Sequence, residues 1–119
     1  FGEDFTGWDS SYSGAPIPLP EMREWRDAIV SLIRSHHPRR ILEVGVGTGL
    51  LLSRLAPDCD EYWGTDFSGA VIERLTAEVT SAGLHDRVVL RHQAADVVDG
   101  LPTDHFDTIV LNSVAQYFP

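Results

Sequence analysis

Apolar and polar residues alternate along the chain with two periodicities, one typical of helices and one typical of strands. Between residues 21 and 37 the apolar positions recur every three or four residues, which predicts one amphipathic helix ended by Pro38. The side chains predicted to form its buried stripe are Met22, Trp25, Ile29, Leu32 and Ile33. Residues 1–20 carry spaced prolines instead and are expected to form an extended arm.

Short β-prone runs and helical stretches follow in turn after this helix. Strands are predicted at residues 40–44, 61–65, 88–91 and 108–111. One helical stretch runs over residues 50–55 and is closed by Pro57, and a second lies between a capping Ser68 and Gly83. The helix between Ser68 and Gly83 has a predicted buried stripe of Val71, Ile72, Leu75 and Val79. This alternation predicts a doubly wound parallel α/β sheet with its ligand at the carboxyl ends of the strands.

Composition narrows the class of protein. A chain of 119 residues, 43% hydrophobic and 23% charged, has the size and balance of one soluble domain. The net charge of -9 disfavours a nucleic-acid partner, because binding to a phosphate backbone needs clustered cations. No apolar run approaches the roughly 20 residues that span a membrane, so no membrane partner is expected. Cys59 is the only cysteine, which excludes an internal disulfide and favours a cytoplasmic location.

Three glycines, Gly45, Gly47 and Gly49, follow the first predicted strand. Glycine there lets the backbone adopt a positive φ and lets a ligand approach without meeting a Cβ. The dinucleotide fingerprint G-x-G-x-x-G fails by one residue, since its third position holds Leu50. Glu43 should point to the same edge, where its charge attracts a cation and repels a pyrophosphate. The pattern favours S-adenosylmethionine over a nicotinamide dinucleotide; the alternative is a tight turn beside an exposed Glu43.

Asp66 ends the second predicted strand and is the candidate ribose contact. It follows Gly45 by about 20 residues, the spacing expected of the acid that accepts both ribose hydroxyls. The alternative is a helix cap, since caps favour the same residue types. Ser68 is the better cap, which would leave Asp66 free for a ligand.

Asp96 follows the third predicted strand and is the candidate adenine contact. A carboxylate accepts a hydrogen bond from the adenine amino group and so selects adenine over other bases. A solvated loop aspartate is the alternative. The remaining candidates around the cofactor are Phe67 and Ala95, which adjoin the two acids, and Asn112, which closes the fourth strand with Ser113.

Aromatic residues and histidines offer further candidates. Tyr12, on the predicted arm, is expected either to cover the ligand or to dock on the sheet. Trp25 and Trp63 invite comparison with an aromatic cage, but their places on a helix stripe and on a strand favour core packing. His36 and His37 are neighbours on a helix and do not share a face, so no metal site is expected.

The motifs together resemble a known family. The chain resembles a class I S-adenosylmethionine-dependent methyltransferase. The resemblance rests on Ile41–Gly49, Asp66, Ala95–Asp96 and Phe106–Val110. More narrowly, it resembles the N-methyltransferase domains embedded in nonribosomal peptide synthetases, on Tyr62–Ser68, Leu111–Pro119, Trp8, Tyr12 and Ile17–Pro18.

The resemblance implies a fold and a reaction. The fold is a Rossmann-like methyltransferase core, residues 1–119, with strand order 3-2-1-4 and with the C-terminal half of a seven-stranded domain absent. The reaction is methyl transfer to the α-amino group of an aminoacyl thioester on a carrier protein, beside an adenylation domain. Glu43 and the glycines would hold the methionine portion, Asp66 the ribose and Asp96 the adenine. The alternatives are a small-molecule O- or C-methyltransferase, a non-catalytic scaffold domain of a megasynthase, and a nicotinamide oxidoreductase.

Overall fold

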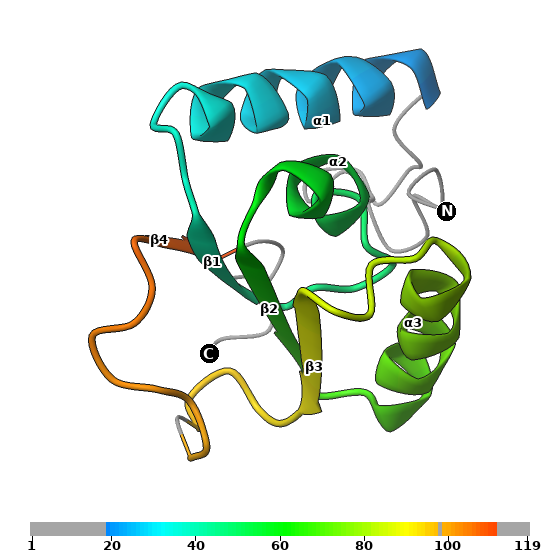
Figure 1. The fold of residues 1–119 in the computed structure, drawn as a ribbon. Helices are drawn as coiled ribbons and strands as arrows, with labels where there is room; N and C mark the ends of the chain where they lie inside the picture. Colours follow the sequence, from blue (N-terminus) through cyan, green and yellow to red (C-terminus); the bar gives the residue numbers. More distant parts are fainter. Residues whose placement is uncertain (1–18, 98, 112–119) are drawn as a thin grey trace.

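The fold is built on four strands and the helices between them, seen in a computed structural model that describes residues 19–97 and 99–111. The elements in chain order are α1 (Leu19–Arg34), β1 (Arg40–Val44), α2 (Leu52–Leu55), the 3-10 helix η1 (Ala56–Asp58), β2 (Glu61–Asp66), α3 (Gly69–Ser81), β3 (Val88–His92) and β4 (Thr108–Leu111). Figure 1 shows α1 above the strands and α3 to their right. The predicted alternation of strands and helices is confirmed.

The four strands form one parallel sheet in the order β3-β2-β1-β4. β1 pairs in parallel with both β2 and β4, and β2 pairs in parallel with β3. The chain therefore winds outward from β1 to β3 and then returns to the opposite side of β1 at β4. The winding direction reverses beside the end of β1, which is the point where open α/β sheets bind ligands. The predicted strand order is confirmed.

The described helices cover one face of the sheet. Residues of the sheet and of all three helices form one core on this face. The sheet contributes Ile41 and Tyr62, α1 contributes Val30 and Ile33, α2 contributes Leu52 and Leu55, and α3 contributes Leu75 and Val79. On the opposite face Leu42 and Val44 pack against Trp63 and against residues of the segment between β3 and β4: Ala95, Leu101 and Phe106. The predicted core position of Trp63 is confirmed.

The ends of the helices differ from the predicted ends in several places. α1 begins at Leu19, which contradicts the predicted extended arm at Leu19 and Pro20, because proline is well accommodated in the first turn of a helix. The rest of that arm, residues 1–18, lies outside the described residues. α2 begins at Leu52 and not at residue 50.

α1 stops at Arg34, before the predicted end at residue 37, because His37 has a φ of 51° that an α-helix cannot contain. α2 is not closed by Pro57 either, since η1 carries the chain through that residue. Proline is tolerated there because the first turn of a helix leaves its N–H groups unbonded.

The buried stripe of α1 was predicted wrongly at two positions. Trp25 is 51% exposed and Leu32 is 64% exposed, whereas Arg26 is only 3% exposed. The buried stripe contains Met22, Arg26, Val30 and Ile33, and of these Val30 and Ile33 belong to the core shared with the sheet. An arginine can occupy a buried stripe because its long aliphatic stem covers apolar surface.

No helix in the described part of the chain is long and apolar enough to cross a membrane.

Candidate functional site

The chain makes its glycine turn between the carboxyl end of β1 and α2. Gly45, Gly47 and Gly49 have φ values of 82°, 56° and 84°, a region that L side chains rarely adopt. The N–H groups of Gly45 and Val46 both donate to the carbonyl oxygen of Thr65, each at 2.9 Å. The turn is therefore fastened to the end of β2, beside the point where the winding of the sheet reverses.

The middle of the turn is open on its outer side. A Cβ added to Gly47 would meet no atom within 4 Å, so a ligand can approach the backbone there. The inner side is closed, since a Cβ on Gly64 of β2 would lie 2.9 Å from Cγ2 of Val46. Gly64 therefore lets β2 pass beneath the turn, a role that the sequence did not reveal.

Asp66 holds the turn and the start of α3 together. Its Oδ2 accepts the N–H of Gly47 and its Oδ1 accepts the N–H of Ser68, both at 3.0 Å, and the residue is 8% exposed. The expectation that Asp66 is left free is therefore wrong. Ser68 is the cap of α3, as predicted, and its hydroxyl accepts the N–H of Val71. Each carboxylate oxygen of Asp66 still has a second lone pair for a ligand.

Glu43 lies one residue before the end of β1 and is 0% exposed, which contradicts the alternative of an exposed acid beside a turn. The hydroxyl of Tyr62 on β2 donates to its Oε1 at 2.6 Å. Burial, followed by the negative charge of Glu43 and the hydrogen bond to it, raises the pKa of Tyr62 well above its usual value. The phenol therefore stays protonated and remains a donor at ordinary pH.

The segment after β3 is brought beside Asp66. The N–H of Gln93 donates to the carbonyl oxygen of Asp66 at 2.9 Å. Two residues further on, Ala95 is half-buried against the face that carries Leu42, while Asp96 is exposed in the adjoining turn. The structure thus places the predicted ribose and adenine contacts at the same edge of the sheet.

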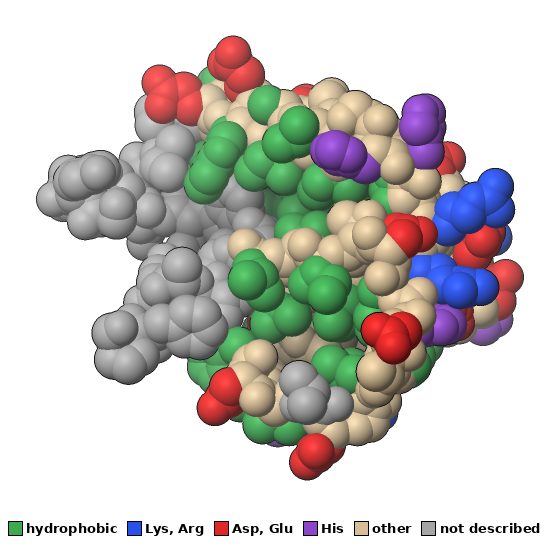
Figure 2. All heavy atoms as spheres, turned by 90° about the vertical axis from the view of Figure 1, so that its left-hand side faces the viewer, with side chains coloured by type: hydrophobic (Ala, Val, Ile, Leu, Met, Phe, Trp, Pro, Cys, Tyr) green, Lys and Arg blue, Asp and Glu red, His purple; other side chains and the backbone are tan. Residues whose placement is uncertain are grey.

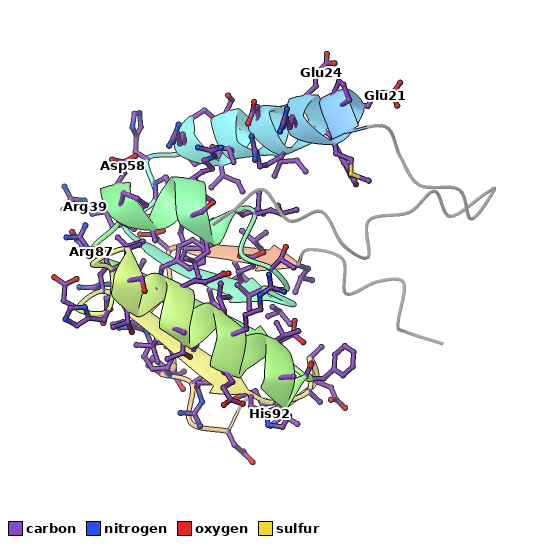
Figure 3. The ribbon with its side chains drawn as sticks, turned by 90° about the vertical axis from the view of Figure 1, so that its right-hand side faces the viewer. Glu21, Glu24, Arg39, Asp58, Arg87 and His92 are labelled. Carbon is purple, nitrogen blue, oxygen red and sulfur yellow. The ribbon has the colours of Figure 1, made fainter. Side chains whose placement is uncertain are left out.

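Phe67 follows Asp66 with its side chain 60% exposed. Its carbonyl oxygen lies 2.9 Å from Nε2 of His92, the last residue of β3. Figure 3 labels His92 at the end of the sheet away from Arg39, Asp58 and Arg87. Tyr12, Asn112 and Ser113 complete the predicted set, and all three lie outside the described residues.

A cavity of about 310 Å³ lies at the amino ends of the strands, away from the glycine turn. Its lining includes Arg34, Arg39, Asp58 and Cys59. Arg34 pairs with Asp58 at 3.5 Å and Arg39 with Asp60 at 3.6 Å, so its charges largely neutralise one another. None of the predicted site residues belongs to this cavity.

Comparison with known families and curated proteins identifies relatives of the whole chain. Residues 42–119 match the family described as Methyltransferase domain. The probable non-canonical nonribosomal peptide synthetase CymA of Salinispora arenicola is 51% identical over 118 residues, which cover 99% of this chain and 2% of that protein. Enniatin synthase of Fusarium equiseti is 40% identical over 120 residues, covering 99% of this chain and 4% of that protein. The chain thus spans only a small part of the curated relatives it matches.

Solved structures resemble the fold at lower identity. Magnesium protoporphyrin IX methyltransferase from Synechocystis PCC 6803, solved with bound SAM, aligns with a TM-score of 0.68 at 17% identity and covers 85% of this chain and 49% of its own. The YcgJ protein from Bacillus subtilis gives a TM-score of 0.68 at 21% identity, covering 81% of this chain and 40% of its own. At these identities the likeness establishes the Rossmann-like fold alone.

Proposed function

The chain belongs to this family of methyltransferase domains, and we propose that it binds S-adenosylmethionine at the carboxyl edge of its sheet and methylates the α-amino group of a carrier-bound aminoacyl thioester. The observation that carries the cofactor assignment is the glycine turn between two buried carboxylates, Glu43 and Asp66. S-adenosylmethionine brings an ammonium and a sulfonium to this edge, whereas the pyrophosphate of a dinucleotide would be repelled by both acids.

The residues present fit this cofactor. The open side of Gly47 gives a ligand access to the backbone of the turn. Asp66 keeps acceptor capacity for two ribose hydroxyls although both its oxygens already accept a backbone N–H. Phe67, Ala95 and Asp96 follow the ends of β2 and β3 and would surround the adenine. Tyr12 and Asn112 remain proposed members of the site.

The protein would contribute to the reaction mainly by holding the cofactor and the amine in the geometry of attack. When bound, the cofactor would supply a sulfonium methyl group to a neutral amine nitrogen: the C–N bond would form as the C–S bond breaks, the sulfur would leave as a thioether, and the nitrogen would then release a proton to solvent. Glu43, Asp66 and the glycine turn would fix the cofactor in the geometry of attack. Effective concentration of this kind lowers a barrier by about 7–11 kcal/mol when the alignment is good.

The acceptor is proposed from the relatives. CymA and enniatin synthase are named as synthetases, and this chain corresponds to a short stretch within each of them. A methyltransferase domain in that setting would meet its substrate as an aminoacyl thioester on a carrier-protein arm and would adjoin an adenylation domain. A cytoplasmic location agrees with the free, buried thiol of Cys59.

Calorimetric titration tests the cofactor assignment. We expect S-adenosylmethionine to bind and reduced nicotinamide dinucleotide not to bind. Asp66→Ala should weaken binding by about 1–3 kcal/mol through loss of charge-assisted hydrogen bonds. Asp58→Ala is the matched control, because Asp58 is an exposed acid at the opposite end of the sheet (Figure 3). Equal affinity in the two variants would remove Asp66 from the site.

Mass spectrometry of the carrier arm tests the acceptor. Incubation with S-adenosylmethionine and an aminoacyl-loaded carrier protein should add one methyl group, and fragmentation should place it on the amino nitrogen. Cofactor binding without transfer to any carrier-bound amino acid would favour a scaffold role. Methylation of oxygen or carbon in a free small molecule would refute the proposed acceptor while leaving the cofactor site intact.

A further inference from the structure

Glu43 carries a carboxyl group that is withdrawn from solvent. The residue is 0% exposed and lies on the sheet face that packs against the helices, beside Ile41 and Tyr62 of the apolar core. An ionised carboxylate taken out of water is costly unless hydrogen bonds and charges compensate it. A buried carboxylate therefore needs a hydrogen-bond donor that stabilises its charge and fixes its orientation.

Tyr62 supplies that partner from the neighbouring strand. The parallel register pairs Ile41 with Tyr62 and Glu43 with Gly64, so Tyr62 and Glu43 point to the same face. Gly64 has no side chain on this face, and the phenol of Tyr62 reaches the carboxyl group of Glu43 directly. The resulting hydrogen bond is 2.6 Å long, as expected of a donor bound to a charged acceptor.

The phenol is fixed in this position. Tyr62 is 0% exposed and belongs to the core shared by α1, α2 and α3, so its ring cannot swing away from Glu43. Burial and the neighbouring carboxylate raise its pKa well above the usual value, so the O–H remains a donor. A permanent, immobile donor is what holds one oxygen of a carboxylate in a single direction.

We propose that Tyr62 is a positioning residue that fixes the Glu43 carboxylate as the counter-charge for the ammonium group of the cofactor's amino-acid portion. The inference rests on the proposed function and deepens it. A buried charge acts through a low dielectric, so it attracts a nearby cation more strongly than an exposed one does. A carboxylate held before the ligand arrives also avoids the loss of side-chain freedom that binding would otherwise require.

Comparing the affinities of two ligands distinguishes a positioning role of the Tyr62 hydroxyl from a role in core packing alone. S-adenosylhomocysteine carries the ammonium group, whereas 5′-methylthioadenosine has the same adenosine but lacks the whole amino-acid portion. Tyr62→Phe keeps the ring and removes only the hydroxyl. We expect it to weaken S-adenosylhomocysteine binding about tenfold, as for loss of a hydrogen bond to a charged group, and to leave 5′-methylthioadenosine within about twofold.

Three further variants complete the titration. Glu43→Gln should show the same selective loss, and adding Tyr62→Phe to it should cost little more, because the two groups act as one unit. Thr65→Val is the matched control, since it removes a buried hydroxyl from the other face of the same strand. It should affect both ligands equally or not at all.

The outcomes distinguish the two levels of the proposal. Unchanged binding of both ligands to Tyr62→Phe, or an equal loss of both, would overturn the positioning role and leave the cofactor site in place. Failure of the unaltered protein to bind either ligand would overturn the proposed function itself. If Tyr62→Phe does not fold, the positioning role can be tested in the unaltered protein by the NMR signal of the Tyr62 ring carbons. It should shift with S-adenosylhomocysteine and not with 5′-methylthioadenosine, and equal shifts would refute the role.

Discussion

Gly47 meets two requirements at one position, a backbone conformation and an open approach for a ligand. Its φ of 56° lies in the left-handed region, and a Cβ there would meet nothing within 4 Å. Gly83, at the C-terminal end of α3, has a φ of 75° and equally open surroundings. The two glycines therefore carry the same conformational requirement, but only Gly47 lies where a cofactor is proposed to bind.

This pair gives a prediction at the scale of the residue. Gly47→Ala and Gly83→Ala should each lower the free energy of unfolding by about 1–2 kcal/mol, the cost of a Cβ in the left-handed region. Only Gly47→Ala should also weaken S-adenosylmethionine binding, because its methyl group occupies the approach to the backbone. Urea denaturation and calorimetry check the two effects separately. Equal cofactor affinity in both variants would contradict the proposed place of the ligand.

Single residues also mark the limits of sequence reasoning. The glycines, Glu43 and Asp66 could be picked out because their spacing along the chain is itself the signal. Tyr62 could not, since its link to Glu43 depends on the strand register, which no local pattern encodes. The hydrogen bond from Gly47 to Asp66 was missed for the same reason, because it requires the glycine turn to lie over the end of β2. The bond from Ser68 to Asp66 is local, two residues along the chain, and was missed because Ser68 alone was expected to act as the cap.

At the scale of the element, strands and the larger helices were predictable and their ends less so. β4 spans the predicted residues, and α3 has the predicted cap at Ser68 and the positive φ at Gly83. These features follow from local chemistry that the sequence carries directly. The stripe of α1 depends instead on how the helix packs against its neighbours, which is why Trp25 was misplaced.

The start of α3 yields a prediction of its own. Ser68→Ala removes the hydroxyl that accepts the N–H of Val71, so the free energy of unfolding should fall by about 1 kcal/mol. Ser68→Asp should restore most of the loss, since aspartate caps as well as serine. Thr76→Ala is the control, because the Thr76 hydroxyl donates to Ile72 within the helix and its removal should be neutral or stabilising. A fall in stability as large for Thr76→Ala would refute the capping role.

At the scale of the whole molecule, the two ends of the sheet have different chemistry. The carboxyl end carries the glycine turn and the two buried acids, and the amino end carries paired charges around Cys59. Burial, followed by the negative charges of Asp107, Asp58 and Asp60, raises the pKa of the Cys59 thiol to about 11. An unfolded thiol has a pKa of about 8.5, so the folded chain retains a proton that the unfolded chain releases.

Stability should therefore fall in alkaline solution. Between about pH 9 and 11 the folded state binds more protons than the unfolded state, and raising the pH then favours unfolding. Urea denaturation at a series of pH values should give a declining free energy of unfolding across this window. The decline should be shallower in Cys59→Ala, whatever that variant loses in packing at pH 7. Parallel declines in both proteins would show that the thiol does not contribute.

The sheet face opposite the helices is partly exposed. The register pairs Leu42 with Ile109 and Val44 with Leu111, which places all four on this face. Leu42 and Val44 are buried, but Ile109 is 62% and Leu111 is 69% exposed, and both lie on β4, at the edge of the sheet that the described residues form. Figure 2, viewed from the left-hand side of Figure 1, shows hydrophobic side chains gathered in the middle of its face.

An apolar edge strand exposes unpaired backbone groups and hydrophobic side chains together, a combination that favours association between copies of a chain. We expect the chain of residues 1–119 to self-associate in sedimentation velocity as its concentration rises. Replacing both Ile109 and Leu111 with threonine should weaken this association, because threonine keeps the strand propensity and removes apolar surface. Leu32→Gln is the matched control, since Leu32 is 64% exposed on α1 and away from any sheet edge. An equal effect of the two changes would mean that total exposed apolar area governs association and that the edge of β4 has no special part in it.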